Sequence, residues 1–445
     1  FCLSRGLGDV YKRQFYNCKS LKKADLSSCA VENIAMYTFE SCDALETVLL
    51  PQGLKGIGQY AFRNCVKLSE ISLPEGLVTL NAQAFSGCGQ YFEKTGLKTG
   101  LKSITVPSTV TTIGKSVFEN CAALEEATVK STSVGENMFL GCVSLKKVTI
   151  GAETESIKAL AFSGCKSLAE VNMQSNVLAE IGKGAFQNTA ITQFTVPDTV
   201  DTLGAGSASS TGAKDGIFYG CSQLETVTIG INVETIPDCM FADCESLSSV
   251  VFKENGKVKM IGRMAFFNCR SLKSIVFKDG LEYIGDGVFT TFGSALEEIS
   301  IPASVKEIHP FAFSEANFYS GGLKKITVFG DTTNSRYYSD ADSALIERNE
   351  NGDRLLLFAN GSPLTEYVVP ASVKELGRNC FFRNANLVKV TLPSDITELP
   401  YGCFAVCLSL KEIVLPAVLR NASCDSADGA TNGFVGGLQP SGKSG

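Results

Sequence analysis

The chain has 445 residues, a formal net charge of −6, and 44% hydrophobic residues. Its longest apolar runs are about four to six residues, whereas a membrane-spanning helix needs roughly 18, so we expect no membrane-spanning segment. A nucleic-acid binder normally presents a basic face, and this acidic balance argues against one. The single histidine, His309, excludes metal sites that need several histidines and leaves one possible imidazole base for catalysis.

Residues 1–14 are the first segment, and we expect them not to belong to the native protein. The eleven residues from Ser4 to Gln14, SRGLGDVYKRQ, match in order the in-frame translation of a transposase adaptor used for sequencing libraries. A segment of this kind is set aside from fold reasoning, like a cloning scar. We therefore expect the chain to be a fragment, because the adaptor replaces whatever lay upstream, including any signal peptide.

From Phe15 onward the chain repeats one pattern. Two consecutive copies are CDALETVLLPQGLKGIGQYAFRNC, ending at Cys65, and CVKLSEISLPEGLVTLNAQAFSGC, ending at Cys88. Both have the form C-x-x-L-x-x-[VI]-x-[LVI]-P-x-x-[VL]-x-x-[IL]-G-x-x-A-F-x-x-C. The phenylalanine of this pattern recurs fifteen times, mostly at steps of 21 to 25 residues: Phe15, Phe39, Phe62, Phe85, Phe118, Phe139, Phe162, Phe186, Phe218, Phe241, Phe266, Phe289, Phe313, Phe381 and Phe404.

One copy illustrates the local structure that we expect. In LETVLL, Leu45, Val48 and Leu50 should point into the stack, because side chains alternate along a strand. Thr47 and Leu49 should then point outward. The proline that follows ends the strand, since it cannot donate a ladder hydrogen bond.

The second half of the copy should close the coil. Gly58 suits a left-handed corner, because glycine has no Cβ to clash there. The segment QYAFRNC is expected to form a short helical turn with Ala61 and Phe62 pointing inward. One such coil cannot bury its apolar face alone, whereas stacked neighbours can.

A period near 23 with an L-x-x-V-x-I core falls in the leucine-rich repeat range. The proline after the strand, the I-G-x-x-A-F corner and the cysteine-to-leucine step resemble the BspA-like leucine-rich repeat family of bacterial and protozoal surface proteins. The resemblance covers residues 15–416. It implies a leucine-rich-repeat solenoid of about 15 stacked coils of ~23 residues, with one short parallel strand per coil, turns and short helical segments, and one β-hairpin insertion.

The cysteines follow the repeat. Of the 17 cysteines, eleven stand three residues after the repeated phenylalanine: Cys18, Cys42, Cys65, Cys88, Cys121, Cys142, Cys165, Cys221, Cys244, Cys269 and Cys407. We interpret them as a packing ladder, because a free cysteine is a small hydrophobe that is readily buried. A disulfide between adjacent rungs is the alternative, although parallel thiols rarely reach the required torsion. A zinc site has no CxxC pair or histidine partner.

Four places depart from the repeat. Loops lengthen the steps at 89–100 and 204–216. Residues 330–369 leave the pattern, and two apolar runs flank Asn351-Gly352, which predicts a β-hairpin that either lies against the solenoid edge or forms a lip for a partner. Residues 417–445 are off-pattern, and we expect them to be disordered or a truncated tail. Their P-loop match, Gly437 to Ser444, lacks the strand and helix that a phosphate loop needs, so we predict no nucleotide site.

The outward strand positions line one face of the expected stack. The central position carries hydroxyl or amide side chains in successive coils: Thr105, Thr128, Thr149, Asn172, Thr195 and Thr228. Beside it stand Lys102, Glu126, Lys147, Glu170 and Gln193. The row reflects either strand propensity on a solvated face or a ladder that meets a glycan or a protein strand. No aromatic row accompanies it, which weakens a sugar-stacking site.

No catalytic constellation emerges, and we expect His309 to be an exposed turn residue. We therefore predict a non-enzymatic binding or adhesion solenoid without metal or cofactor. The resemblance implies a secreted or cell-surface bacterial protein that contacts protein or glycan partners. An intracellular protein-interaction scaffold and an accessory region of a larger enzyme remain alternatives. The complete reading frame would distinguish the three. A leader with a sorting tail selects the surface protein, neither of them selects the scaffold, and a catalytic domain selects the accessory region.

Overall fold

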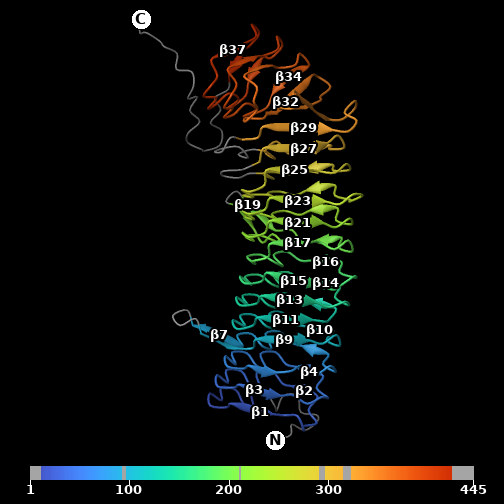
Figure 1. Ribbon diagram of the computed structural model, residues 1–445, viewed down its shortest axis with the longest axis vertical. Helices are drawn as coiled ribbons and strands as arrows, with labels where there is room; N and C mark the ends of the chain where they lie inside the picture. Colours follow the sequence, from blue (N-terminus) through green and yellow to red (C-terminus); the bar gives the residue numbers. More distant parts are fainter. Residues whose placement is uncertain (1–11, 93–96, 210–211, 290–295, 314–321, 423–445) are drawn as a thin grey trace, which may run out of the picture. The chain divides into compact units, whose positions relative to one another are not determined.

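The computed structural model describes residues 12–92, 97–209, 212–289, 296–313 and 322–422, and it consists of short strands joined by turns (Figure 1). The chain divides into two compact units, residues 1–245 and 246–445. Each unit is a β-solenoid built from parallel coils, and the described residues make about sixteen turns in all. The leucine-rich-repeat fold predicted from the sequence is thereby confirmed.

In unit 1 each coil contributes two strands. We call the strand that follows the leucine of the repeat the leucine-side strand, and the one at the opposite corner the corner strand. Each strand pairs in parallel with the equivalent strand of a neighbouring coil. The leucine-side strands are β1 Lys23–Asp25, β3 Thr47–Leu49, β5 Glu70–Ile71, β9 Ser103–Val106, β11 Glu126–Val129, β13 Lys147–Ile150, β15 Glu170–Met173, β17 Gln193–Thr195 and β21 Thr226–Ile229. The corner strands are β2 Asn33–Ile34, β4 Gly56–Ile57, β6 Thr79–Leu80, β10 Thr112–Ile113, β12 Ser133–Val134, β14 Ser156–Ile157, β16 Glu180–Ile181, β18 Thr202–Leu203 and β22 Thr235–Ile236.

Unit 2 repeats this plan around an antiparallel insertion. Its leucine-side strands are β23 Ser249–Phe252, β25 Ser274–Val276, β27 Glu298–Pro302, β29 Lys325–Phe329, β33 Glu366–Val368, β35 Lys389–Thr391 and β37 Glu412–Val414. Its corner strands are β24 Met260–Ile261, β26 Tyr283–Ile284, β28 Glu307–Ile308, β34 Val373–Leu376, β36 Glu398–Leu399 and β38 Asn421–Ala422. Strand β38 lies in the first residues of the predicted off-pattern tail and pairs with β36. The P-loop match lies outside the described residues.

The alternation expected within a coil is present. Leu45, Val48 and Leu50 are buried, whereas Leu49 is 38% exposed. Burying one such aliphatic side chain contributes roughly 1.5–3 kcal/mol before the entropy cost. Since the described coils repeat the pattern, the core of each unit is a column whose layers are supplied by successive coils.

The closing turn differs from the expected short helix. Tyr60 and Asn64 both adopt positive φ, 59° and 60°, which interrupts any helix around them. Backbone amides alternate in direction: that of Ala61 donates to Gly58 within the coil, whereas that of Phe62 donates to Ala84 in the next coil. No helix occurs among the residues described, because half of the amides in this turn bond to the neighbouring coil.

The corner glycine also has a different role from the one predicted. Gly58 is absent from the positive-φ residues, so a left-handed corner is the wrong reason for it. A Cβ at this position would lie 2.7 Å from the backbone of Ala35 and Met36. Glycine is needed here because the preceding coil passes too close for any side chain.

The repeated phenylalanines form a stack within each unit. Nine successive ring pairs from Phe15 to Phe241 have centroid distances of 5.0 to 5.8 Å and nearly parallel planes. In unit 2 Phe266, Phe289 and Phe313 continue in the same way. Aromatic pairs at these distances attract beyond the effect of buried area, so the stack binds neighbouring coils to each other.

The long step between Phe313 and Phe381 contains a rung that the sequence pattern missed. Phe358 is fully buried, lies 5.3 Å from Phe381, and its amide donates to Cys380 of the next coil. It follows LLL instead of the usual G-x-x-A, and Gly361 stands where the cysteine would. Only its spacing of 23 residues before Phe381 indicated it.

The predicted hairpin around Asn351-Gly352 is present and joins β31 Ala344–Glu347 to β32 Asp353–Phe358 in antiparallel pairing. A further strand, β30 Tyr337–Asp340, pairs with β31, and β32 pairs in parallel with β34. The insertion is therefore built into the coil ladder on one side.

The two lengthened steps, interpreted as loops, also contain antiparallel strand pairs: β7 Gly89–Phe92 with β8 Leu97–Gly100, and β19 Ser207–Ser209 with β20 Gly212–Lys214.

Candidate functional site

The cysteine ladder has a defined hydrogen-bond geometry. The thiol of Cys65 donates to the carbonyl oxygen of Phe39 in the preceding coil at 3.1 Å. Equivalent bonds of 3.0 to 3.2 Å are made by Cys42, Cys88, Cys121, Cys142, Cys165, Cys221, Cys244 and Cys407. The described cysteines form no disulfide.

Burial makes these thiols poor nucleophiles. Removal from water raises the pKa of Cys42 and of Cys221 to about 11, and it raises the pKa of Cys65 and Cys165 further. The thiolate is the reactive species. These four rungs are therefore structural, and they contribute no nucleophile near neutral pH.

The predicted face lies on the leucine-side strands of unit 1. Thr105, Thr128, Thr149 and Asn172 are cross-strand neighbours in β9, β11, β13 and β15, which lie side by side (Figure 1). Adjacent strands in a sheet are about 4.8 Å apart. The structure therefore brings these four side chains into one continuous row, which we call the Thr/Asn row.

The last two candidates form a separate pair. Thr195 in β17 is the direct neighbour of Thr228 in β21. Strands β17 and β21 belong to a different sheet from β9 to β15. All six side chains are exposed or half-buried, so both groups are open to solvent.

Charged side chains flank the Thr/Asn row. Glu126, Lys147 and Glu170 occupy adjacent register positions, and Lys147 pairs with Glu170 at 2.5 Å. The hydrogen bond and charge of that carboxylate raise the pKa of Lys147. Ser103, and not Lys102, stands in this register, which corrects the row assumed from the sequence by one residue. Exposed ion pairs contribute little to stability, so these charges are available to orient a partner.

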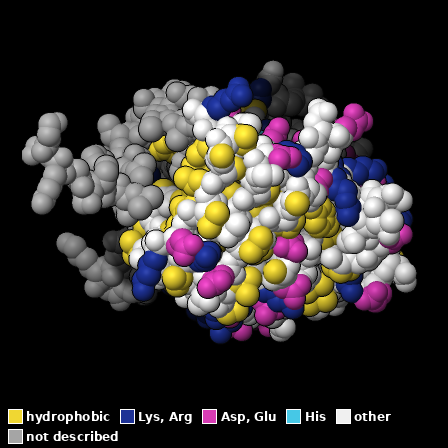
Figure 2. All heavy atoms as spheres, turned by 90° about the horizontal axis from the view of Figure 1, so that it is seen from above, with side chains coloured by type: hydrophobic (Ala, Val, Ile, Leu, Met, Phe, Trp, Pro, Cys, Tyr) yellow, Lys and Arg dark blue, Asp and Glu magenta, His cyan; other side chains and the backbone are white. Residues whose placement is uncertain are grey.

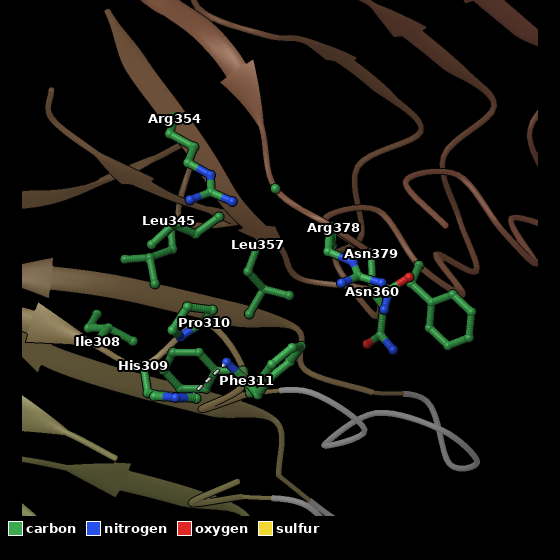
Figure 3. A pocket seen from close by; sticks show the side chains of 14 residues that line it. Ile308, His309, Pro310, Phe311, Leu345, Arg354, Leu357, Asn360, Arg378 and Asn379 are labelled. Atoms are coloured by element: carbon green, nitrogen blue, oxygen red, sulfur yellow. Dashed lines mark hydrogen bonds between the residues drawn. The ribbon is translucent and has the colours of Figure 1, made fainter. Parts of the chain in front are cut away.

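His309 is half-buried next to a turn, whereas we expected an exposed turn residue. It lies on the wall of a cavity in unit 2 together with Phe311, Leu345 and Arg354 (Figure 3). Its Nδ1 accepts a hydrogen bond from the backbone amide of Phe311 at 3.3 Å and lies 3.5 Å from a carboxylate oxygen of Asp286. The backbone amide of the neighbouring Ile308 donates to the Tyr337 hydroxyl of β30 at 2.9 Å, which ties this corner to the insertion.

Apolar side chains are exposed at the β37 end of unit 2. Leu408 is 83% exposed, and Val414, Leu415 and Val418 are also exposed. Figure 2, which looks onto this end, shows apolar side chains interspersed with acidic and basic ones. The last described coil therefore presents part of the apolar column to its surroundings.

Neither a catalytic nor a metal site is evident in the described part of the chain. Within those residues no three His, Cys, Asp or Glu side chains gather in a way that suits a metal ion. The same residues include no helix of the length and apolarity needed to cross a membrane. The exposed strand face and the cavity are the two candidate binding features.

Comparison with solved structures identifies the same architecture. A leucine-rich repeat protein from Bacteroides ovatus ATCC 8483 is 24% identical, with a TM-score of 0.50, and the match covers 86% of this chain and 82% of that one. A leucine-rich cell surface protein from Faecalibacterium prausnitzii A2-165 is 22% identical, with a TM-score of 0.36, over 77% and 66% of the chains. The pneumococcal vaccine antigen PcpA is 18% identical, with a TM-score of 0.34, over 77% and 57%.

Sequence comparison extends over most of the chain. No curated protein matches it significantly. The family profile described as BspA type leucine-rich repeat region, six copies, matches residues 2–93, 90–214, 211–339 and 356–426. Fold and family are those of repeat proteins that generally have a non-catalytic binding role. The chain belongs to the BspA-type leucine-rich repeat family.

Proposed function

We propose that this protein is a non-enzymatic binding solenoid that contacts a partner protein through the Thr/Asn row and its flanking charges. The observation that carries the proposal is the register of Thr105, Thr128, Thr149 and Asn172 across four consecutive parallel strands. A row of this kind offers hydroxyl and amide groups at a regular strand spacing of about 4.8 Å. Main-chain groups of an extended peptide segment are complementary to such a row.

A protein partner is favoured over a glycan by the composition of the face. Sugar-binding surfaces commonly use aromatic rings, whereas the exposed positions of β9, β11, β13 and β15 carry hydroxyl, amide and charged side chains. The alternating charges of Glu126, Lys147 and Glu170 add an electrostatic pattern that fixes register more than affinity. A glycan ligand is the alternative outcome of the binding experiment below.

We further propose that the native protein is secreted or attached to the bacterial cell surface. Membership of the BspA-type family supports this location. The complete reading frame of the gene tests it: a leader peptide with a wall-anchor or sorting signal is expected. A full-length gene with neither would favour an intracellular scaffold, and a catalytic domain would favour an accessory role.

The binding proposal is tested with a double variant, Thr128→Lys with Thr149→Lys, which places two long charged side chains in the centre of the row. A matched control is Ser108→Lys with Asn176→Lys, at exposed turn positions in the same unit. The full chain and both variants are assayed by surface plasmon resonance against arrays of purified surface proteins and glycans. Because two of the four side chains of the row are replaced by long charged ones, we expect at least about a tenfold loss of affinity in the row variant alone.

Two results would contradict the proposal. One is equal binding by the row variant and the wild type to every partner that the wild type binds. The other is an equal loss in the control, which would locate binding elsewhere. Thermal unfolding of both variants checks the fold, and we expect both to be close to wild type, since surface substitutions usually change stability by within about 0.5 kcal/mol.

A further inference from the structure

The cavity in unit 2 has a volume of about 290 Å³ and is enclosed by three separate parts of the chain. These are the corner that follows β28, the antiparallel strands β31 and β32, and the turn that follows β34. The corner lies one coil before the insertion, so the cavity is formed where the insertion breaks the regular stack. It is distinct from the Thr/Asn row of unit 1.

One side of the cavity is basic. Arg354 of β32 and Arg378 after β34 both line it, and in Figure 3 they lie on either side of Leu357. Neither forms an ion pair with a described residue, and the Nε of Arg354 is buried without a hydrogen-bond partner there. A buried donor without a partner is rare in folded proteins and calls for an explanation.

Neighbouring arginines show that this is not a general feature of the insertion. Arg336 makes two hydrogen bonds to Glu347, at 2.7 and 2.9 Å. Arg348 donates to the carbonyl oxygens of Thr332 and Ser335, at 2.6 and 2.7 Å. The guanidinium groups that hold the insertion together are satisfied, whereas the one at the cavity is not.

The charge around the cavity is one-sided. None of its lining residues is acidic. The Nδ1 of His309 accepts a hydrogen bond from the Phe311 amide. Asp286 approaches His309 from outside the lining at 3.5 Å. The charged groups that line the cavity are therefore cationic, which favours an anionic ligand.

Much of the rest of the cavity wall is apolar. Leu345 and Phe313 are buried, Leu357 and Phe382 are half-buried, and Phe311 is 47% exposed at the rim. Small-molecule sites typically combine such apolar walls with a few convergent polar groups. Aromatic rings prefer the edges and faces of other rings, and three of these side chains are phenylalanines.

We propose that this cavity binds a carboxylate that carries an aromatic ring. A guanidinium group is a planar fork that matches the two oxygens of a carboxylate, and Arg354 and Arg378 supply it. The ring of the ligand packs among Phe311, Phe382 and Leu357. A free arylalkanoic acid and the terminal carboxylate of a peptide that ends in phenylalanine present the same chemistry.

The experiment uses isothermal titration calorimetry of the full chain with phenylpropionate. We expect one-to-one binding with a Kd at or below about 1 mM. Phenylpropanol, which has the same ring and no charge, should bind at least about tenfold more weakly, because a hydrogen bond to a charged group contributes more than one between neutral groups. A tripeptide ending in phenylalanine, as free acid and as amide, distinguishes the two sources: tighter binding of the free-acid peptide than of phenylpropionate identifies a chain terminus.

Matched variants locate the site. Arg354→Gln should weaken phenylpropionate binding about ten- to a hundredfold, and Arg420→Gln, an exposed arginine outside the lining, should leave it unchanged. If Arg354→Gln fails to fold, Arg378→Gln at an exposed position gives the same test. Absence of saturable binding, equal affinity for the alcohol, undiminished binding by the folded arginine variant, or equally tight binding of inorganic phosphate would each overturn the proposal.

Discussion

The thiol of Cys165 donates a hydrogen bond to the carbonyl oxygen of Phe139, which lies 3.1 Å away in the preceding coil. The same oxygen accepts the backbone amide of Cys142 at 3.1 Å. One carbonyl thus receives a donor from its own coil and a donor from the next. Because the arrangement recurs through unit 1, the cysteine ladder connects coils as well as filling space between them.

Replacing one ladder cysteine should therefore cost more than the removal of a surface thiol. We expect Cys165→Ala to lower the free energy of unfolding by about 1–2 kcal/mol, through the lost hydrogen bond and a small cavity. Cys18→Ala, at the same repeat position but exposed, should change it by less than about 0.5 kcal/mol. Urea unfolding followed by circular dichroism measures both, and equal effects would contradict the role assigned to the ladder.

The buried thiols also predict a loss of stability at alkaline pH. Their folded pKa values lie above the ordinary value of 9.0, at about 11 for Cys221, because burial disfavours the thiolate. Below pH 9 the thiols are protonated in both states, and stability is at its full value. Between pH 9 and the folded pKa the unfolded chain ionises first, so the free energy of unfolding falls by up to about 1.4 kcal/mol per pH unit for each thiol.

Urea unfolding from about pH 8 to about pH 10.5 measures this slope. Cys221→Ala should have a shallower slope than the wild type. A stability that is constant over this range would show that the thiols ionise equally in the folded and unfolded states.

The exposed end of unit 2 predicts self-association. Leu408 and Leu415 expose apolar surface next to β37, and exposed apolar patches favour association. Leu408→Glu should reduce the apparent mass in light scattering at high protein concentration. Val78→Glu, which changes an exposed valine of unit 1, should have no such effect. A wild-type chain that stays monomeric at every concentration would contradict this prediction.

The sequence predicted the parts of the fold that repeat. The positions of Leu45, Val48 and Phe62 follow from the repeat period of about 23 residues. Their burial was therefore predictable from spacing alone. The Thr/Asn row was predictable for the same reason, since outward positions inherit the register of inward ones.

The sequence did not predict features that depend on contacts between coils. Gly58 is required by the backbone of Ala35, which no local pattern describes. Phe358 lacks the residues that usually surround the repeated phenylalanine, and was missed. The cavity combines the segments of His309, Arg354 and Arg378, and the pairing of β32 with β34 that brings the last two together is visible only in three dimensions.

The central claim is that each coil depends on its neighbours and that the chain presents its binding features on this stack. Phe162 lies 5.5 Å from Phe139 and 5.4 Å from Phe186, and Phe162→Ala should cost about 3–5 kcal/mol. Stability in a repeat array is a sum of coil and interface contributions. Hydrogen exchange should therefore rise in residues 139–186 and hardly change beyond Phe266. Equal acceleration from Phe39 to Phe404 would mean that the chain unfolds as one cooperative globule, which would contradict the account.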